Sequence, residues 1–501
     1  MILATRLACL LLALGACTMG PNFERPVSAW PLAGWGKPAP GDAPAQSQPV
    51  AEPIDPQWWR LLDDPLLTEL ETRLVGANLD LRTADLRLTE ARAQLGVTQA
   101  TRLPAVNANG SVTRQQQSRE GVLALTSATA SPATNANGLG GRTSTPNTRV
   151  QHPYDLFQYG FDASWELDLW GRVARNVESS AAQVTASEEV LRDTLVTASA
   201  ELARDYVQLR GTTRKLDITR QNLASARESL RLTQERAAGG LTTDLDVANA
   251  AAQVEATAAQ LPALEQQKAQ LINALSFLLG EPPRALEVTL AAPRALPKVP
   301  PRVPVGLPSE LARRRPDIRR AEAVLHSATA EIGVATADFY PRVMLSGSGA
   351  IQGLQLRNLA DWPAQAYAFG PSVSLPIFEG GRLKRTLELR EAQQKEAAVT
   401  FQRTVLAALH EVDNALTAYD AEQRRRNRLQ AAATQASRAL GIARQRYEQG
   451  VADFLQVLIA QRNQLAAEQE LADSTTAVST DLVQLYKVLG GGWQASYPAI
   501  D

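Results

Sequence analysis

The sequence predicts a mainly α-helical protein that carries a transmembrane β-barrel and contains two structural repeats per chain. Three observations predict this fold: long stretches without proline, short segments of alternating apolar and polar residues, and motifs that recur in both halves. The composition of the 501 residues agrees, because a hydrophobic fraction of 45% excludes global disorder. The near balance of 51 basic and 52 acidic residues excludes a nucleic-acid binder held by bulk positive charge.

The N-terminus predicts a secreted, lipid-anchored chain. Residues 1–16 have one early basic residue, Arg6, followed by an apolar run, which is the pattern of a signal peptide. They end in a Leu-Gly-Ala sequence before Cys17, which resembles a bacterial lipobox, so we predict acylation of Cys17. The alternative is an ordinary signal peptide with a chance cysteine. Thr18, in place of the aspartate that holds many lipoproteins at the inner membrane, favours the outer membrane.

Two proline-free stretches, 154–261 and 377–497, predict very long helices, because proline inside a helix costs about 3 kcal/mol. Within 382–448 the apolar residues are spaced alternately by four and three positions, as in supercoiled helices. These residues are Phe401, Val405, Ala408, Val412, Ala415 and Tyr419. A similar pattern runs through 455–489. A helix of about 65 residues would be roughly 100 Å long, so we expect an elongated molecule.

Four short segments alternate with a period of two and predict strands near 105–113, 157–169, 343–352 and 367–377. Each has roughly the 9–11 residues of a strand that crosses a bilayer. Aromatic residues near their ends are typical of the girdles of outer-membrane barrels. Two soluble hairpins with one buried face would give the same alternation, and the lipoprotein signal favours the barrel.

The two halves of the chain repeat each other. Segment 236–245 aligns with 446–455 at an offset of 210, and both contain a glycine turn. We therefore assign an N-terminal proline-rich segment at 17–65, a first repeat at 66–281, a proline-rich linker at 282–308, a second repeat at 309–490 and a tail at 491–501. Each repeat is predicted to contain a helix, two strands, a long helix and a further helix, with 114–152 inserted as a surface loop in the first repeat.

Four strands cannot close a barrel, and an open sheet edge in lipid leaves backbone groups unpaired. Two copies would give eight strands, whose interior is filled by side chains. Three copies give twelve strands and room for a channel. We therefore predict a homotrimer with a twelve-stranded β-barrel, continued by a long α-helical barrel because each strand runs directly into a helix.

Several motifs resemble a known family, the outer-membrane factors of tripartite efflux and type I secretion systems. The most similar branch is that of the lipid-anchored TolC-like channels paired with resistance–nodulation–division pumps (the OprM and NodT branch). The resemblance covers the chain from Cys17 to Trp493. It rests on motifs in 17–26, 58–66, 165–172, 314–318, 340–343, 376–381, 446–450 and 486–493.

The resemblance implies a passive outer-membrane exit duct that is anchored by lipid, extends into the periplasm and conducts drugs or other small solutes. The implied partners are a periplasmic adaptor, an inner-membrane resistance–nodulation–division transporter and outer-membrane lipid. It also implies that Leu455 and Ile459 line the periplasmic narrowing. Relatives often carry an acid at the position of Ile459, so we expect a mainly apolar gate here. The expected adaptor contacts are Gly239, Gly240, Leu241, Asp244, Gly450, Val451 and Asp453.

No enzyme, cofactor, metal site or nucleic-acid partner is expected. His410-Glu411 begins like a zinc-protease helix, but Asn414 stands where the second histidine ligand would be. The main alternative function is a periplasmic coiled-coil lipoprotein that acts as a scaffold without a pore. The alternative to the gate is that Leu455 and Ile459 are ordinary packed helix residues. The sequence does not name the cargo, the pump or the adaptor.

Overall fold

The structure is a computed structural model that describes residues 18–26, 47–116, 153–292, 294–297, 299–306 and 314–497. The predicted signal peptide, Cys17, most of the 114–152 loop and the end of the tail lie outside these residues. The chain divides into two compact units. The first contains residues 1–22, 94–179 and 329–391, and the second contains 23–93, 180–328 and 392–501.

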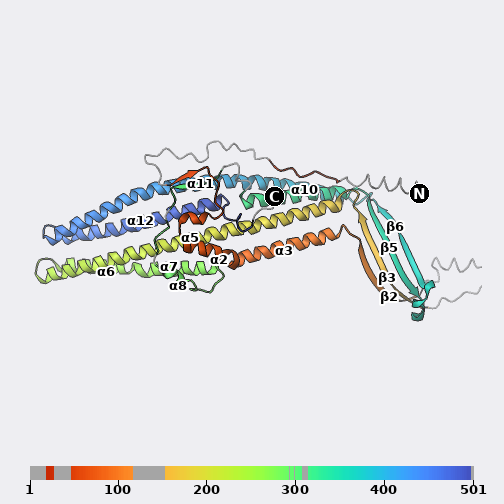
Figure 1. Ribbon diagram of the computed structural model, residues 1–501, viewed down its shortest axis with the longest axis horizontal. Coiled ribbons are helices and arrows are strands. Elements are labelled where there is room, and N and C mark those ends of the chain that lie inside the picture. Colours follow the sequence, from red (N-terminus) through yellow and green to blue (C-terminus); the bar gives the residue numbers. More distant parts are fainter. Residues whose placement is uncertain are drawn as a thin grey trace, which may run out of the picture. The chain divides into compact units, whose positions relative to one another are not determined.

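The first unit contains an antiparallel sheet of four strands in the order β2-β3-β5-β6 (Figure 1). The strands are β2 (Ala105–Gln115), β3 (Tyr154–Leu167), β5 (Arg342–Gly353) and β6 (Gln365–Ser374). The first two come from the first repeat and the last two from the second. In the register, Phe161 of β3 lies opposite Ala108 of β2 and Gly349 of β5, and Gly349 lies opposite Tyr367 of β6.

This register aligns the alternating patterns of all four strands. One face of the sheet is apolar because side chains alternate across a strand, and its members are Val106, Val112, Phe157, Tyr159, Phe161, Trp165, Val343, Leu345, Ile351, Tyr367, Phe369 and Val373. The other face is polar and includes Asn107, Asn109, Thr113, Asp162, Ser164, Ser346, Ser348 and Ser372. Most of the large residues of the apolar face are exposed, with Phe369 at 83%, and the others, such as Phe157 and Trp165, are partly exposed. Among the described residues, the turn after β5 contacts one end of this face, where the Tyr159 hydroxyl donates to the carbonyl of Leu359.

Two strands end earlier than the alternation predicts. β6 ends at Ser374, so Leu375 and Ile377 lie beyond the strand. Pro376 lies between them and has no N–H for a ladder bond. β3 ends at Leu167, because the carboxylate of Asp168 accepts bonds from the backbone N–H groups of Val173 (2.9 Å) and Ala174 (2.7 Å). Asp168 thus caps the following helix instead of continuing the strand.

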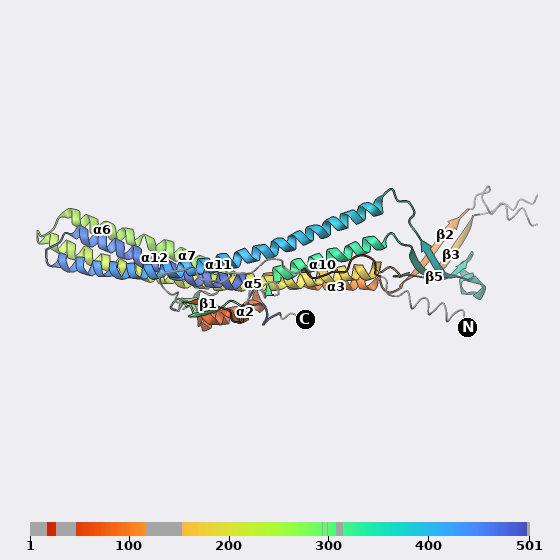
Figure 2. The same ribbon diagram turned by 90° about the horizontal axis from the view of Figure 1, so that it is seen from above.

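Two helices of 67 residues each, α5 (Arg172–Ala238) and α11 (Arg382–Glu448), account for the long proline-free stretches. The other main helices are α2 (Pro65–Ala77), α3 (Leu79–Ala100), α10 (Pro316–Ala337) and α12 (Phe454–Val488). All six residues of the α11 pattern, from Phe401 to Tyr419, are buried. Both views show α12 beside the later part of α11 (Figures 1 and 2).

Among the described residues, no helix is both long and apolar enough to span a membrane.

The two repeats differ in their last helical segment. The second repeat has the single helix α12, whereas the first has α6 (Asp244–Ala258) and α7 (Gln260–Leu278), so the single helix expected in the first repeat is wrong. The interruption is at Ala259, three residues before Pro262. Proline lacks the N–H for the helical hydrogen bond and its ring crowds the carbonyl four residues earlier.

The two proline-rich segments meet in the second unit, which the sequence did not predict. Strand β1 (Gln48–Val50) pairs in parallel with β4 (Arg302–Pro304). A short 3-10 helix, η1 (Trp58–Leu62), follows β1, and a short helix, α8 (Glu287–Ala291), precedes β4. The Trp58 ring stacks on Tyr486 of α12 with 5.2 Å between ring centroids. The main apolar core therefore joins these segments to α2, α5, α11 and α12.

Asp64 connects three parts of this core. Its carboxylate caps α2 by accepting from the Leu66 N–H (2.9 Å), and it accepts a bond from the Tyr206 hydroxyl of α5 (2.5 Å). Arg294 of the linker donates to the same carboxylate (3.2 Å). Burial and the bond to Asp64 raise the pKa of Tyr206 to about 12, so its hydroxyl stays protonated as the donor.

Glu71 of α2 is a buried carboxyl group without a cationic partner in the described core. It is 2% exposed, and Ser199 of α5 is the polar group that interacts with it. Burial raises the pKa of Glu71 well above its usual 4.5, because the charged form loses its hydration. Folding therefore shifts the equilibrium of Glu71 toward the protonated acid relative to the unfolded chain.

We predict that Glu71→Gln stabilises the protein at neutral pH. The folded pKa of Glu71 lies above the unfolded value, so its contribution to stability is fully present below about pH 4.5 and is lost as pH rises through the folded pKa. The variant should lose this part of the pH dependence in urea unfolding followed by circular dichroism. Glu69→Gln, at an exposed site on the same helix, is the control. Identical slopes against pH in wild type and Glu71→Gln would contradict the prediction.

Candidate functional site

The two helical hairpins of the second unit end in turns of the same type. In the first, Gly240 has a φ of 70°, and the N–H of Leu241 donates to the carbonyl of Arg236 (2.9 Å). In the second, Gly450 has a φ of 77°, and the N–H of Val451 donates to the carbonyl of Arg446 (3.0 Å). Both are glycine-terminated helix ends, in which only glycine adopts the left-handed conformation without strain.

The helices that follow these turns begin differently. Thr243 caps α6 and forms a capping box with Asp246, whose carboxylate also accepts from the Thr242 hydroxyl (2.6 Å). These bonds to Thr242 and Thr243 lower the pKa of Asp246. Asp453 is the cap residue of α12, but its side chain makes no capping bond. Side-chain hydrogen bonds among Thr242, Thr243 and Asp246 thus stabilise the start of α6, and the start of α12 has no equivalent capping bonds.

Arg236 joins the two hairpins close to these turns. Its guanidinium donates to the carbonyl of Tyr447 (2.8 Å) at the end of α11 and lies over the Tyr447 ring at 4.6 Å. Tyr447 also packs edge-on against Phe454 of α12 (5.5 Å). A cation at the carbonyl end of a helix is favourable because of the helix dipole. Arg236 begins the repeated segment 236–245, but its role could not be predicted because its partner Tyr447 is distant in sequence.

The two residues expected at the narrowing lie on the exposed side of α12. Leu455 is 55% exposed and Ile459 is 49% exposed, whereas their neighbours Phe454, Val457 and Leu458 are buried. Leu455 and Ile459 are four positions apart and therefore share one face of the helix. They are not packed inside this chain, so a partner or a lumen must account for two adjacent apolar side chains.

The residues expected to contact an adaptor are all exposed and are divided between the two turns. Gly239, Gly240, Leu241 and Asp244 lie at the first turn, and Gly450, Val451 and Asp453 lie at the second. Leu241 is 69% exposed and Val451 is 61% exposed, so each turn presents one large apolar side chain and one carboxylate.

Cys17 lies outside the described residues, but the residues after it are held firmly within the first unit. The N–H of Met19 donates to the carbonyl of Trp170 (3.1 Å), just after β3. Arg175 of α5 donates to the carbonyl of Met19 (3.2 Å) and to the side-chain oxygen of Asn22 (2.6 Å). Gly20 has a φ of 85°, and a Cβ there would lie 2.5 Å from the Cα of Gly333, so this contact requires glycine.

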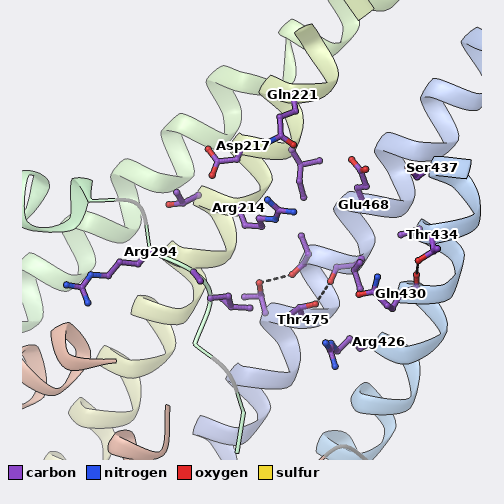
Figure 3. A pocket seen from close by; sticks show the side chains of 18 residues that line it. Arg214, Asp217, Gln221, Arg294, Arg426, Gln430, Thr434, Ser437, Glu468 and Thr475 are labelled. Carbon is purple, nitrogen blue, oxygen red and sulfur yellow. Dashed lines mark hydrogen bonds between the residues drawn. The ribbon is translucent and has the colours of Figure 1, made fainter. Parts of the chain in front are cut away.

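A groove of about 860 Å³ lies between α5, α11, α12 and the linker residues 294–296 (Figure 3). The groove is lined by the apolar residues Ile218, Ala433 and Ala472, among others. Arg214, Asp217, Arg426 and Glu468 bring charges of both signs to it. The carboxylate of Glu468 is already bonded by Asn222 (2.9 Å) and Gln464 (2.8 Å). The residues that line the groove include no histidine or cysteine.

The described residues contain no cluster of three or more His, Cys, Asp or Glu side chains that could hold a metal ion.

Comparisons with known proteins agree with one another. The family model described as outer membrane efflux protein matches residues 72–281 and 307–491. The chain is 35% identical over 485 residues to the outer membrane protein OprJ of Pseudomonas aeruginosa, covering 96% of this chain and 94% of the relative. It is 30% identical to the toluene efflux pump outer membrane protein TtgI of Pseudomonas putida, covering 97% of each.

The chain is also 33% identical over 439 residues to the pyoverdine export outer membrane protein OpmQ of Pseudomonas aeruginosa, covering 88% of this chain and 88% of the relative. Among solved structures, the outer-membrane channel OprN superimposes with a TM-score of 0.84 at 34% identity, covering 95% of this chain and 100% of that one. The mainly helical, twice-repeated fold predicted from the sequence is therefore confirmed. The chain belongs to the outer membrane efflux protein family and is an outer-membrane exit duct of an efflux pump.

Proposed function

We propose that three copies of this chain form one duct, which receives solutes from a periplasmic adaptor and an inner-membrane resistance–nodulation–division transporter. The observation that carries the proposal is the four-stranded sheet with one continuous apolar face and two edges, β2 and β6. In lipid these edges need hydrogen-bond partners, and a second copy supplies them if its β2 pairs with β6 of the first. Twelve strands then leave an open interior.

A non-pore scaffold would not need this sheet. Its apolar face would be exposed to water, and a contiguous apolar surface of that kind marks a membrane or protein interface. We therefore favour the duct. We propose that the chain catalyses no reaction and uses no cofactor or nucleic acid.

Different relatives at similar identity are named for different cargoes, toluene for TtgI and pyoverdine for OpmQ. This supports the view that the duct itself selects weakly and that the transporter and adaptor choose the solute. We propose that this chain passes drugs or other small solutes in the same passive way. The exposed turn residues, from Gly239 to Asp244 and from Gly450 to Asp453, are the proposed adaptor contacts.

Leu455 and Ile459 are proposed to form the narrowing of the duct. In a trimer, three Leu455 and three Ile459 side chains would surround one axis. The exposed sides of Leu455 and Ile459 in each copy would then face those of the other two copies. Such a ring can close by excluding water, without a charged residue. Asp453, in the turn next to Leu455, adds a carboxylate outside the ring.

The mass of the particle in mild detergent tests the assembly. We expect three chains per particle by light scattering with detergent subtraction, and a heat-sensitive band above the monomer in an unboiled gel. A stable monomer in both measurements would contradict the closure of the sheet by copies.

Replacing Leu455 and Ile459 together by serine should raise the conductance of the isolated channel in planar bilayers by roughly twofold or more, because a polar constriction stays wetted. Ile442→Ser is the control, since Ile442 is also 49% exposed but lies on α11. Unchanged conductance of the double variant, or an equal rise in the control, would count against the gate.

We further propose that Cys17 is acylated. Met19 donates its N–H to the Trp170 carbonyl and accepts a bond from Arg175 at its own carbonyl. These bonds hold the chain at the end of a proposed membrane strand, where an acyl chain can enter the bilayer. Mass spectrometry of the mature chain should show a start at residue 17 with added acyl mass, and Cys17→Ser should lack that mass. A wild-type chain with a free Cys17 thiol would disprove acylation.

A further inference from the structure

The turn between β5 and β6 is unusually apolar for a loop. It contains two short 3-10 helices, η3 (Leu356–Ala360) and η4 (Trp362–Ala364), at the end of the two strands (Figure 1). Three large apolar side chains on it are exposed: Leu354 at 58%, Leu356 at 67% and Trp362 at 80%. Leaving three such side chains in water is costly, so the turn calls for an apolar contact outside the chain.

The turn folds back over the apolar face of the sheet and not over the polar face. Gly353 belongs to the apolar face, because it lies opposite Phe157 of β3. A Cβ added at Gly353 would lie 3.4 Å from the Cβ of Asn358 and 3.5 Å from a methyl group of Leu359, so η3 is packed against this side. The hydroxyl of Tyr159, also on the apolar face, donates to the carbonyl of Leu359 (3.4 Å). Two independent contacts therefore place η3 on the side of Phe161 and Tyr367.

The charges on the turn suit an interfacial position. Arg357 is exposed and forms no ion pair with any described residue, and Asp361 precedes Trp362. A tryptophan and leucines beside a single exposed guanidinium match the layer in which lipid phosphates meet acyl chains. The turn is also continuous with the exposed apolar face, which the outer-membrane location assigns to lipid.

We propose that residues 354–364 form a lipid-binding foot, in which Leu356 and Trp362 enter the interfacial layer of the bilayer and Arg357 faces lipid phosphate. The foot widens the contact between each chain and the membrane at this end of the sheet. This inference rests on the proposed lipid-facing orientation of the sheet.

Single cysteines labelled with a fluorophore test the foot in the full channel reconstituted into vesicles. The mature chain keeps only Cys17, which has no free thiol if it is acylated, and unmodified protein carried through the labelling is the blank. Trp362→Cys reports on the foot, Phe369→Cys on the centre of the apolar face and Ser348→Cys on the polar face. Each label is exposed to quenching by spin-labelled lipid and by aqueous iodide.

We expect the label at 362 to be quenched by the spin-labelled lipid, as the label at 369 is, and the label at 348 to be quenched by iodide alone. Quenching at 362 by iodide only, with lipid quenching retained at 369, would overturn the foot and leave the proposed duct intact. Protection of 362 from both quenchers would show that a second copy covers it, which also overturns the foot. Loss of lipid quenching at 369 would instead contradict the orientation of the sheet.

The headgroup contact is tested with the same label at 362, by comparing quenching by spin-labelled phosphatidylglycerol and phosphatidylcholine. Arg357→Gln should lower the preference for phosphatidylglycerol by about fivefold, the factor expected for one cation near an anionic bilayer surface. Asp361→Asn is the matched variant of opposite sign and should raise the preference. Equal preferences in all three proteins would overturn the role of Arg357.

Discussion

The hydrogen-bonding demand of the two sheet edges is the constraint on which the rest of the molecule depends. The four strands satisfy one another in the interior of the sheet, but the outer sides of β2 and β6 still carry backbone N–H and C=O groups. In a bilayer each unpaired group costs several kcal/mol, so a single sheet of this kind is not stable in lipid. Symmetric copies remove both edges at once, since β6 of one copy can pair with β2 of the next.

The need to pair backbone groups also explains how β3 and β6 end. Each of these strands is followed by a long helix, and the residues of each junction satisfy or turn the backbone between strand and helix. Asp168 accepts bonds from the first N–H groups of α5, and Gly171, with a φ of 75°, turns the chain between strand and helix. At the corresponding junction of the second repeat, Gly380 and Gly381 have φ values of 59° and 84° before α11 begins. Neither α5 nor α11 contains proline, and a proline in either helix would remove a hydrogen bond from the helix interior.

The features set by local periodicity could be predicted from the sequence, and those set by distant contacts could not. The spacing from Phe401 to Tyr419 predicts the buried side of α11, and the alternation around Phe161 predicts the apolar face of β3, because both depend only on residues a few positions apart. The pairing of Gln48–Val50 with Arg302–Pro304 joins segments far apart in sequence that are short and contain proline. The bond from Arg236 to Tyr447 and the return of η3 onto Gly353 likewise exist only once the chain has folded.

The two repeats share their turns but not the residues next to them, and this difference bears on where a narrowing can form. Leu245 of α6 aligns with Leu455 of α12, and Asn249 aligns with Ile459. The amide side chain of Asn249 binds water, whereas the branched alkyl chain of Ile459 excludes it. The first hairpin therefore has one apolar residue at these two positions, and it cannot form an apolar ring like the one proposed for Leu455 and Ile459. The first hairpin is also tied by the capping box at Thr243, whereas α12 begins at Asp453 without a side-chain cap. The apolar pair thus sits on the hairpin whose turn is held by fewer side-chain bonds. Because local stability falls where side-chain bonds are few, we propose that the start of α12 is the part of the narrowing better able to move.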